Sequence, residues 1–182
     1  MIKIAILGST GSIGKTTLNI VSNNKKNFKI VLLTANSNIK FLFNQAKRFN
    51  VKNVIINKKV NSNWIKVFKK KNIKIYNNFE DFNKIFTNKL DYVINAISGM
   101  DGLYPTIKII KHTKKIAIAN KESIICGWNL INKELIKNKT SFIPVDSEHF
   151  SIFQLIKDQD ADSIKKIILT ASGGPFLKKK KI

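Results

Sequence analysis

Short runs of apolar, mostly β-branched residues alternate along the chain with stretches whose apolar residues recur every three or four positions. The first pattern predicts buried strands and the second predicts amphipathic helices. Strands are predicted at Ile2–Leu7, Phe28–Ala35, Asn53–Ile56, Ile73–Tyr76, Tyr92–Ala96 and Ile116–Ala119. Helices are predicted at Gly14–Asn23, Ile39–Phe49, Trp64–Lys70, Leu103–Lys111 and Glu122–Lys137. This alternation indicates βαβ units, and right-handed crossovers predict an α/β fold with a doubly wound parallel sheet.

The pattern changes near residue 140. Ser141–Pro144 and Ser163–Thr170 are predicted to be strands, with an amphipathic stretch at Phe150–Lys157 between them. We therefore expect residues 1–140 to form one domain and residues 141–182 to be the beginning of a second, α+β domain.

The composition disfavours several classes of protein. No run of eighteen apolar residues is present and a strand begins at Ile2, which favours a cytoplasmic protein without a membrane span or leader. A single cysteine, Cys126, excludes a disulfide framework and a cysteine-based zinc site. The net charge of +22 suggests nucleic acid, but only Arg48 among 33 basic residues is an arginine. Because the lysines are scattered along the chain, we attribute the charge to a general enrichment of the sequence in lysine. We therefore expect no nucleic-acid partner.

A glycine-rich turn follows the first predicted strand. Gly8, Gly11 and Gly14 are spaced G-x-x-G-x-x-G directly before a helix. Such glycines let the backbone approach a phosphate, and the helix N-terminus offers unpaired N–H groups. The GKT at residues 14–16 resembles the end of a P-loop, but Ser9 stands where that motif requires glycine. The context favours a dinucleotide over an NTP, and a tight turn that binds nothing is the alternative.

The loop after the second predicted strand carries no carboxylate. NAD enzymes place Asp or Glu there for the ribose 2′-hydroxyl, whereas this chain has Asn36, Ser37 and Asn38, followed by Lys40. Asn36, Ser37 and Lys40 could bind a 2′-phosphate, which favours NADP over NAD. The alternative is an ordinary polar loop in which Asn38 caps the next helix.

Two later strand ends also carry candidate residues. The small residues of the segment 95–102, NAISGMDG, would allow a cofactor to approach closely, although a simple turn fits equally well. Lys121 would face the same edge of the sheet and could neutralise an oxyanion or a substrate phosphate. A solvated lysine at the start of a helix is an equal alternative.

A cluster of acidic residues, Asp146-Ser147-Glu148-His149, follows Pro144 and Val145. In an extended segment both carboxylates would point to one side, which suits Mg²⁺ or Mn²⁺ with a third ligand elsewhere. Zinc through His149 ranks lower, and a helix N-terminus explains the same residues without a metal. Further on, the Ser-Gly-Gly of the segment 171–176 could present donors to a substrate anion.

Five segments together resemble one enzyme family closely. GSTGSIG, NAISGMDGL, IANKES, PVDSEH and LTASGGPF occur in the order typical of 1-deoxy-D-xylulose 5-phosphate reductoisomerases. The resemblance spans essentially the whole chain, and PVDSEH with SGGPF is its most specific part. It implies an NADP-dependent oxidoreductase with a Rossmann-like NADPH-binding domain at residues 1–140 and the start of a catalytic domain at residues 141–182.

The resemblance also implies roles for individual residues. NADPH would contact Thr10, Gly11, Ser12, Ile13, Asn36, Ser37, Asn38, Asn120 and Glu122. Lys121 would be catalytic and would contact the substrate between it and the nicotinamide. Ser147 and Ser172 would bind the substrate, and Asp146 and Glu148 would hold Mn²⁺ or Mg²⁺. Asn36 and Ser37 depart from the glycine-containing loops expected in the family.

The reaction that the resemblance implies isomerises and reduces 1-deoxy-D-xylulose 5-phosphate to 2-C-methyl-D-erythritol 4-phosphate, in isoprenoid biosynthesis. A divalent metal would act as a Lewis acid and NADPH would deliver a hydride. Members of the family are expected to be homodimers. The third metal carboxylate, the lid and a C-terminal helical domain would follow residue 182, so we expect a truncated chain without turnover. Alternatives are another NADP-dependent oxidoreductase and a non-catalytic NADPH-binding remnant.

Overall fold

The computed structural model describes residues 1–169. Its strands are β1 (Ile2–Leu7), β2 (Phe28–Ala35), β3 (Asn53–Ile56), β4 (Lys74–Tyr76), β5 (Leu90–Asn95), β6 (Thr113–Ile118) and β7 (Ser141–Pro144). Its α-helices are α1 (Ser12–Asn23), α2 (Ile39–Arg48), α3 (Ser62–Lys70), α4 (Phe82–Ile85), α5 (Leu103–Ile110), α6 (Lys121–Asn138) and α7 (Ser147–Ile156). Three 3₁₀ turns lie at Phe79–Asp81, Met100–Gly102 and Ala161–Ser163.

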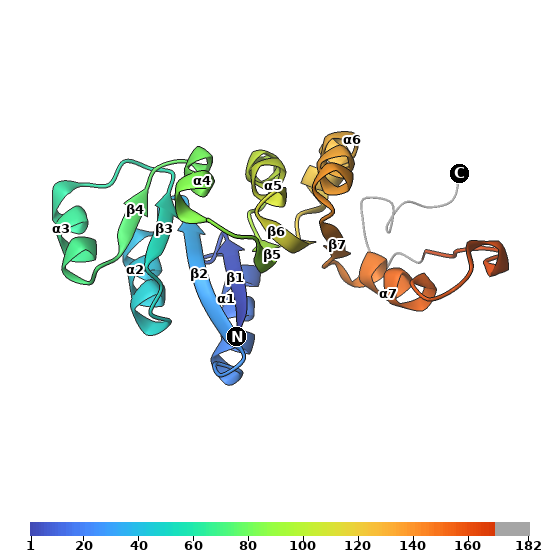
Figure 1. Cartoon of the computed structure of the whole chain (residues 1–182), viewed down its shortest axis with the longest axis horizontal. Helices are drawn as coiled ribbons and strands as arrows, with labels where there is room; N and C mark the ends of the chain where they lie inside the picture. Colours follow the sequence, from blue (N-terminus) through green and yellow to red (C-terminus); the bar gives the residue numbers. More distant parts are fainter. Residues whose placement is uncertain (170–182) are drawn as a thin grey trace, which may run out of the picture. The chain divides into compact units, whose positions relative to one another are not determined.

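The strands form one sheet in the order β4-β3-β2-β1-β5-β6-β7. The pairs β1–β2, β1–β5, β2–β3, β3–β4 and β5–β6 are all parallel. The chain therefore builds outward from β1 in one direction and then returns to build from β1 in the other (Figure 1). The carboxyl ends of β1 and β5 meet at this reversal, which is where ligands bind in open α/β sheets. The predicted doubly wound parallel sheet is confirmed.

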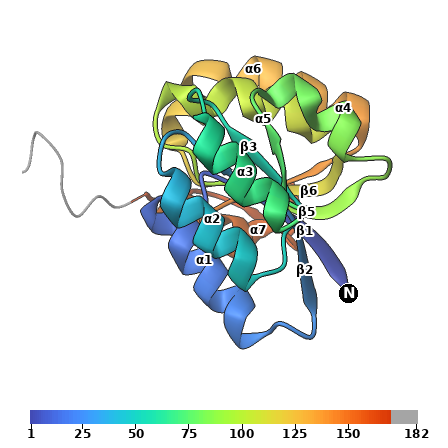
Figure 2. The same cartoon turned by 90° about the vertical axis from the view of Figure 1, so that its left-hand side faces the viewer.

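Helices cover both faces of the sheet because its strands bury side chains on both sides. Ile4 and Ile6 of β1 belong to the apolar cluster that includes Leu18 of α1, Leu42 of α2 and Phe68 of α3. The alternating residues of β1 pack into the opposite cluster, with Phe82 of α4, Ile109 of α5 and Ile131 of α6. Figure 2 shows α1, α2 and α3 together on one side of the strands and α5 and α6 on the other. Burial on both faces explains why the central strands are nearly continuous apolar runs.

The bounds of β1, β2, β3 and β7 are those that the sequence predicts. β5 and β6 begin earlier than predicted, at Leu90 and Thr113, which pair with each other in the ladder. Thr113 is fully buried, and its hydroxyl donates to the carbonyl of Lys115 at 2.8 Å. Because β6 begins with a threonine and two lysines, the hydrophobic pattern does not indicate where it starts.

The predicted strand at Ser163–Thr170 is wrong over its described part. Residues 164–169 have no strand structure, and the side chains of Ile167, Ile168 and Leu169 are more than half exposed. A strand requires a neighbour for its backbone N–H and C=O groups, and no described strand pairs with these residues. Thr170 lies outside the described residues.

The chain divides into two compact units, Met1–Ile143 and Pro144–Ile182. The hydrophobic pattern of the sequence predicts the division three residues earlier, before Ser141. β7 was expected to open the second domain, but it is the last strand of the sheet, next to β6. Phe142 of β7 packs against the apolar cluster formed with α5 and α6. Within residues 1–169, no helix is both long and apolar enough to cross a membrane.

Candidate functional site

A cleft of about 760 Å³ opens at the carboxyl ends of β1, β2, β3 and β5, at the reversal of strand order. Gly8 and Gly11 line it from the turn after β1, Asn36 and Asn57 from the ends of β2 and β3, and Ala96 from the end of β5. Tyr104 and Pro105 of α5 line the opposite wall. We call it the dinucleotide cleft, because Gly8 and Gly11 line it at the reversal of strand order, where open α/β sheets bind dinucleotides.

The glycines of the turn are fixed by close backbone contacts. Gly8 has φ +75°, and a Cβ there would lie 2.8 Å from the carbonyl oxygen of Ala96. A Cβ on Gly14 would lie 2.4 Å from the carbonyl oxygen of Gly8 and 2.6 Å from the Cα of Ser9. These contacts bring α1 and the end of β5 against the turn, so that its backbone forms the surface that a ligand would meet.

The N-terminus of α1 is open to an anion. Gly11 is the N-cap residue, no side chain caps the helix, and its first turn contains no acidic residue. The N–H groups of the first helical residues have no partner inside a helix, and they carry the positive end of the helix dipole. The turn and helix therefore fit the pyrophosphate of a dinucleotide.

Ser9 explains why the turn departs from a P-loop. Its side chain is fully buried, and its hydroxyl donates to Oε1 of Gln45 at 2.8 Å. The amide of Gln45 donates back to the carbonyl of Ser9 at 2.8 Å. This reciprocal pair ties α2 to the turn, and it needs a hydroxyl where a P-loop has glycine.

We expect Ser9→Ala to lower the free energy of unfolding by about 1 kcal/mol, the usual value for one buried hydrogen bond. Urea denaturation of the variant measures the loss. Ser37→Ala is the matched control, because Ser37 is exposed and the same change should leave the unfolding midpoint in place. Equal midpoints for wild type and Ser9→Ala would contradict the role of this pair.

The loop after β2 both lines the cleft and caps the next helix, so it fits the two alternatives that its sequence leaves open. Asn36 lines the dinucleotide cleft, whereas Asn38 is the N-cap of α2 and its Oδ1 accepts from the N–H of Phe41 at 3.3 Å. Ser37 and Lys40 are exposed beside them. The cap that the sequence analysis kept as an alternative is therefore present, and it leaves Asn36 and Ser37 to face a ligand.

The segment after β5 is held by two buried asparagines. The amide of Asn95 donates to the carbonyl of Gly102 at 3.0 Å, and its Oδ1 accepts from the N–H of Ile97 at 3.1 Å. Asn120 donates to the carbonyl of Ile97 at 2.5 Å, and its own Oδ1 is buried without a hydrogen-bond partner in residues 1–169. A buried oxygen in this condition is rare, and an amide donor on a bound nicotinamide is one group that would satisfy it.

Lys121 and Glu122 open α6, directly after Asn120. Both side chains are exposed, and neither forms an ion pair with any residue from 1 to 169. They do not line the dinucleotide cleft itself. Their position at the carboxyl end of β6 is the one that the sequence analysis expects.

The acidic cluster forms the start of α7 and is not an extended segment. Asp146 is the N-cap residue, and its Oδ1 accepts from the N–H of His149 at 3.0 Å and lies 2.7 Å from the His149 ring Nδ1. Glu148 lies in the first turn, and its Oε2 accepts from the Ser147 hydroxyl at 2.9 Å. The helix N-terminus that the sequence offers as the alternative is therefore confirmed, because the capping interactions favour a helix after Asp146.

The described residues contain no group of three His, Cys, Asp or Glu side chains that could enclose a metal ion. Asp146 and Glu148 supply oxygen ligands of the kind that Mg²⁺ and Mn²⁺ prefer. As a set they fit part of such a site, and a further ligand is required.

Of the predicted cofactor residues, the cleft brings together Thr10, Gly11 and Asn36. Ser12 and Ile13 begin α1 at its edge. Asn57, Asn77 and Tyr104 also line the cleft and are not among the residues predicted from the sequence. Asn57 could have been found, because it follows a predicted strand and the ends of parallel strands meet at one edge. Ser172 lies outside the described residues.

Comparisons with known proteins agree with this geometry. Residues 4–127 match the model of the family described as 1-deoxy-D-xylulose 5-phosphate reductoisomerase, and residues 142–182 match the C-terminal domain of the same enzymes. The chain belongs to the 1-deoxy-D-xylulose 5-phosphate reductoisomerase family. The resemblance drawn from the sequence motifs is thereby confirmed.

Two curated reductoisomerases illustrate the match. The protein of Pelagibacter ubique is 59% identical over 180 residues, which are 97% of this chain and 46% of that protein. The protein of Thermoanaerobacter sp. is 40% identical over 181 residues, which are 100% of this chain and 47% of that protein. The chain thus spans about half the length of the curated relatives it matches.

Solved reductoisomerase structures share the fold. The enzyme of Zymomonas mobilis in complex with NADPH is 33% identical and superimposes with a TM-score of 0.88, covering 98% of this chain and 48% of that one. A reductoisomerase in complex with NADPH, fosmidomycin and magnesium is 30% identical with a TM-score of 0.78, covering 85% of this chain and 38% of that one.

Proposed function

We propose that this chain binds NADPH in the dinucleotide cleft and serves the reductoisomerase reaction of its family, in which 1-deoxy-D-xylulose 5-phosphate is isomerised and reduced to 2-C-methyl-D-erythritol 4-phosphate. The observation that carries the proposal is the uncapped N-terminus of α1 behind a glycine turn, at the reversal of strand order. The related structures that contain NADPH support the choice of cofactor.

Two groups of residues in this chain would contact different parts of NADPH. Thr10, Gly11, Ser12 and Ile13 would bind the pyrophosphate through backbone N–H groups and hydroxyls. Asn120 would bind the nicotinamide end, where its buried Oδ1 requires a donor. Glu122 follows in the same helical turn, within reach of the same end of the cofactor.

The substrate would carry a phosphate and neighbouring carbonyl and hydroxyl oxygens. Lys121 offers a positive charge at the carboxyl end of β6, where it would stabilise negative charge that develops on the substrate during reduction. Ser147 and Ser172 would donate hydrogen bonds to the substrate. NADPH would supply the hydride.

Asp146 and Glu148 would hold Mg²⁺ or Mn²⁺, which would polarise the substrate oxygens as a Lewis acid. A related reductoisomerase structure in complex with magnesium covers 99% of this chain, which supports a divalent cation as the metal. We also propose that the protein works in the cytoplasm and that the whole enzyme is a homodimer.

A polypeptide limited to these 182 residues is expected to bind NADPH without converting 1-deoxy-D-xylulose 5-phosphate, because the described residues complete no three-ligand metal site. The loss of NADPH absorbance, with substrate and with or without Mn²⁺, measures turnover, and NADPH fluorescence measures binding in the same samples. Metal-dependent turnover would contradict the expected inactivity while supporting the reaction itself. Binding of NADH but not NADPH would contradict the proposed cofactor.

A further inference from the structure

The loop that should receive the 2′-phosphate of NADPH has no charge of its own. Asn36 and Ser37 are neutral, and Asn38 is already engaged as the cap of α2. NADP sites commonly place a cation near the end of the second strand. A cation for the 2′-phosphate must therefore come from a neighbouring element of the fold.

The loop after β3 continues the ladder with the loop after β2 beyond the strand ends. The N–H of Asn57 donates to the carbonyl of Ala35 at 3.3 Å, and the N–H of Lys58 donates to the carbonyl of Asn36 at 3.1 Å. Lys58 is therefore held directly beside the residue that lines the dinucleotide cleft. These hydrogen bonds fix the main chain of Lys58 next to the cleft, and its flexible side chain starts from that position.

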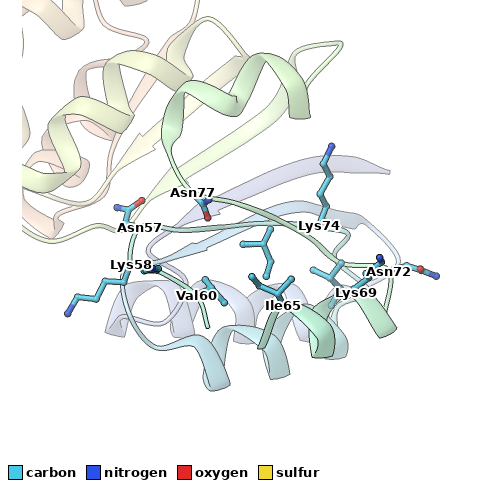
Figure 3. Close-up of a pocket in the computed structure, with 11 residues that line it drawn as sticks. Asn57, Lys58, Val60, Ile65, Lys69, Asn72, Lys74 and Asn77 are labelled. Carbon is cyan, nitrogen blue, oxygen red and sulfur yellow. The ribbon is translucent and has the colours of Figure 1, made fainter. Parts of the chain in front are cut away.

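The surroundings of Lys58 are positively charged. A groove of about 750 Å³ beside β4 has Lys58, Lys59, Lys69 and Lys74 among its lining residues, and no acidic residue lines it. Asn57 and Asn77 line both this groove and the dinucleotide cleft, so the two meet there. In Figure 3 Lys58 lies with Asn57 at that end of the groove. Among residues 1–169, no acidic side chain pairs with its ammonium.

We propose that Lys58 is the cation that binds the 2′-phosphate of NADPH and that sets the preference of this chain for NADPH over NADH. The assignment deepens the proposed function and rests on it. Lys40 is the cation that the sequence alone suggests, but it belongs to the first turn of α2 after the capped Asn38. The backbone N–H of Lys58 donates to the carbonyl of Asn36 itself. From that position the Lys58 ammonium would reach a phosphate that Asn36 and Ser37 can only hydrogen-bond.

The test titrates five forms of the 182-residue chain with NADPH and with NADH: the wild type, Lys58→Ala, Lys58→Arg, Lys59→Ala and Lys40→Ala. Lys58→Ala should weaken NADPH binding about tenfold, the effect of losing one charge-assisted hydrogen bond at a partly exposed site. NADH binding should be unchanged, because it has no 2′-phosphate. Lys58→Arg should restore most of the NADPH affinity. Lys59→Ala removes the same charge from the next residue and should change NADPH binding less than about twofold.

Competition with 2′,5′-ADP and with 5′-AMP isolates the adenosine end. Only 2′,5′-ADP should lose affinity in Lys58→Ala. Equal losses in the Lys58 and Lys59 variants, or a larger loss in Lys40→Ala, would overturn the assignment while leaving NADPH as the cofactor. A wild-type chain that is folded and binds neither NADPH nor NADH would overturn the proposed function and this assignment with it.

Discussion

Gly14→Ala is expected to weaken NADPH binding by at least about tenfold and to destabilise the fold. The added Cβ would lie 2.4 Å from the carbonyl oxygen of Gly8 and 2.7 Å from the carbonyl carbon of Ser9. Both atoms belong to the backbone, so no rotamer change relieves the contact, and α1 has to move away from the turn. That movement separates the N–H groups of the helix from the place where the pyrophosphate would bind.

Two opposing effects set the size of the change in stability. Alanine is favoured over glycine inside a helix by about 1 kcal/mol. Overpacking against backbone costs about 3 kcal/mol, so we expect a net loss of about 2 kcal/mol in urea denaturation. NADPH affinity should fall at least about tenfold, since each 1.4 kcal/mol of lost contact is a factor of ten.

Gly11→Ala provides the matched control for folding. The nearest atom to its added Cβ is the carbonyl oxygen of Gly8, at 3.4 Å, which is ordinary contact. Gly11→Ala should therefore unfold at the wild-type urea concentration. If Gly14→Ala were as stable as Gly11→Ala and bound NADPH as the wild type does, the close packing of α1 on the turn would not be what forms the site.

Acid is expected to destabilise the protein through His112, with the loss beginning near pH 6.5. Burial, together with the nearby charges of Lys111 and Lys89, lowers the pKa of His112 to about 4. The ring lies against Phe82 and Phe86, with centroid distances of 6.1 and 5.6 Å. Its Nε2 is buried, and residues 1–169 provide no hydrogen-bond partner for it. The folded state therefore favours the neutral form of the His112 imidazole.

The direction of the change in stability with pH follows from the protonation of His112 in the folded and unfolded states. Between pH 6.5 and about 4 the unfolded chain holds a proton on this histidine and the folded chain does not. The stabilisation is complete above pH 6.5 and is lost as the pH falls towards 4. The full loss is about 2 to 3 kcal/mol, since each pKa unit corresponds to 1.36 kcal/mol and the ring is only partly buried.

Urea denaturation at a series of pH values measures this dependence. His112→Phe keeps an aromatic ring against Phe82 and Phe86 and should remove most of the loss between pH 6.5 and 5. His149→Gln is the control, because His149 is exposed and the dependence should remain. The carboxylates of Glu80 and Asp91 have lowered pKa values, through contacts with Lys108 and Lys114, so their contributions disappear only at lower pH. A pH dependence unchanged in His112→Phe would exclude this explanation.

The sequence predicts most of the sheet because each buried strand is a continuous apolar run. The bounds of β1 and β2 follow directly from such runs, and the glycine spacing identifies the turn between β1 and α1. The strand predicted at Ser163–Thr170 shows the limit of the method. A run of apolar residues indicates burial, but a strand also needs a neighbour, and that neighbour cannot be read from the run itself.

The candidate site was predicted where residues follow one another in the chain, and it was missed where the fold brings distant residues together. Thr10, Gly11 and Asn36 lie on turns next to predicted strands. Gln45 and Lys58 meet those turns only through contacts over 36 and 22 residues, with Ser9 and Asn36 respectively. No local pattern marks such contacts, because they depend on the order of the strands in the sheet.

The central claim is that NADPH binds in the dinucleotide cleft, and amide NMR of the ¹⁵N-labelled 182-residue chain tests it most directly. Saturable shifts are predicted for the amides of Gly11, Ser12 and Ile13 and for Asn36 and Ala96, with little change at Lys69 or Lys74 of the groove beside β4. Shifts confined to that lysine-lined groove, or none in the folded chain, would contradict the account.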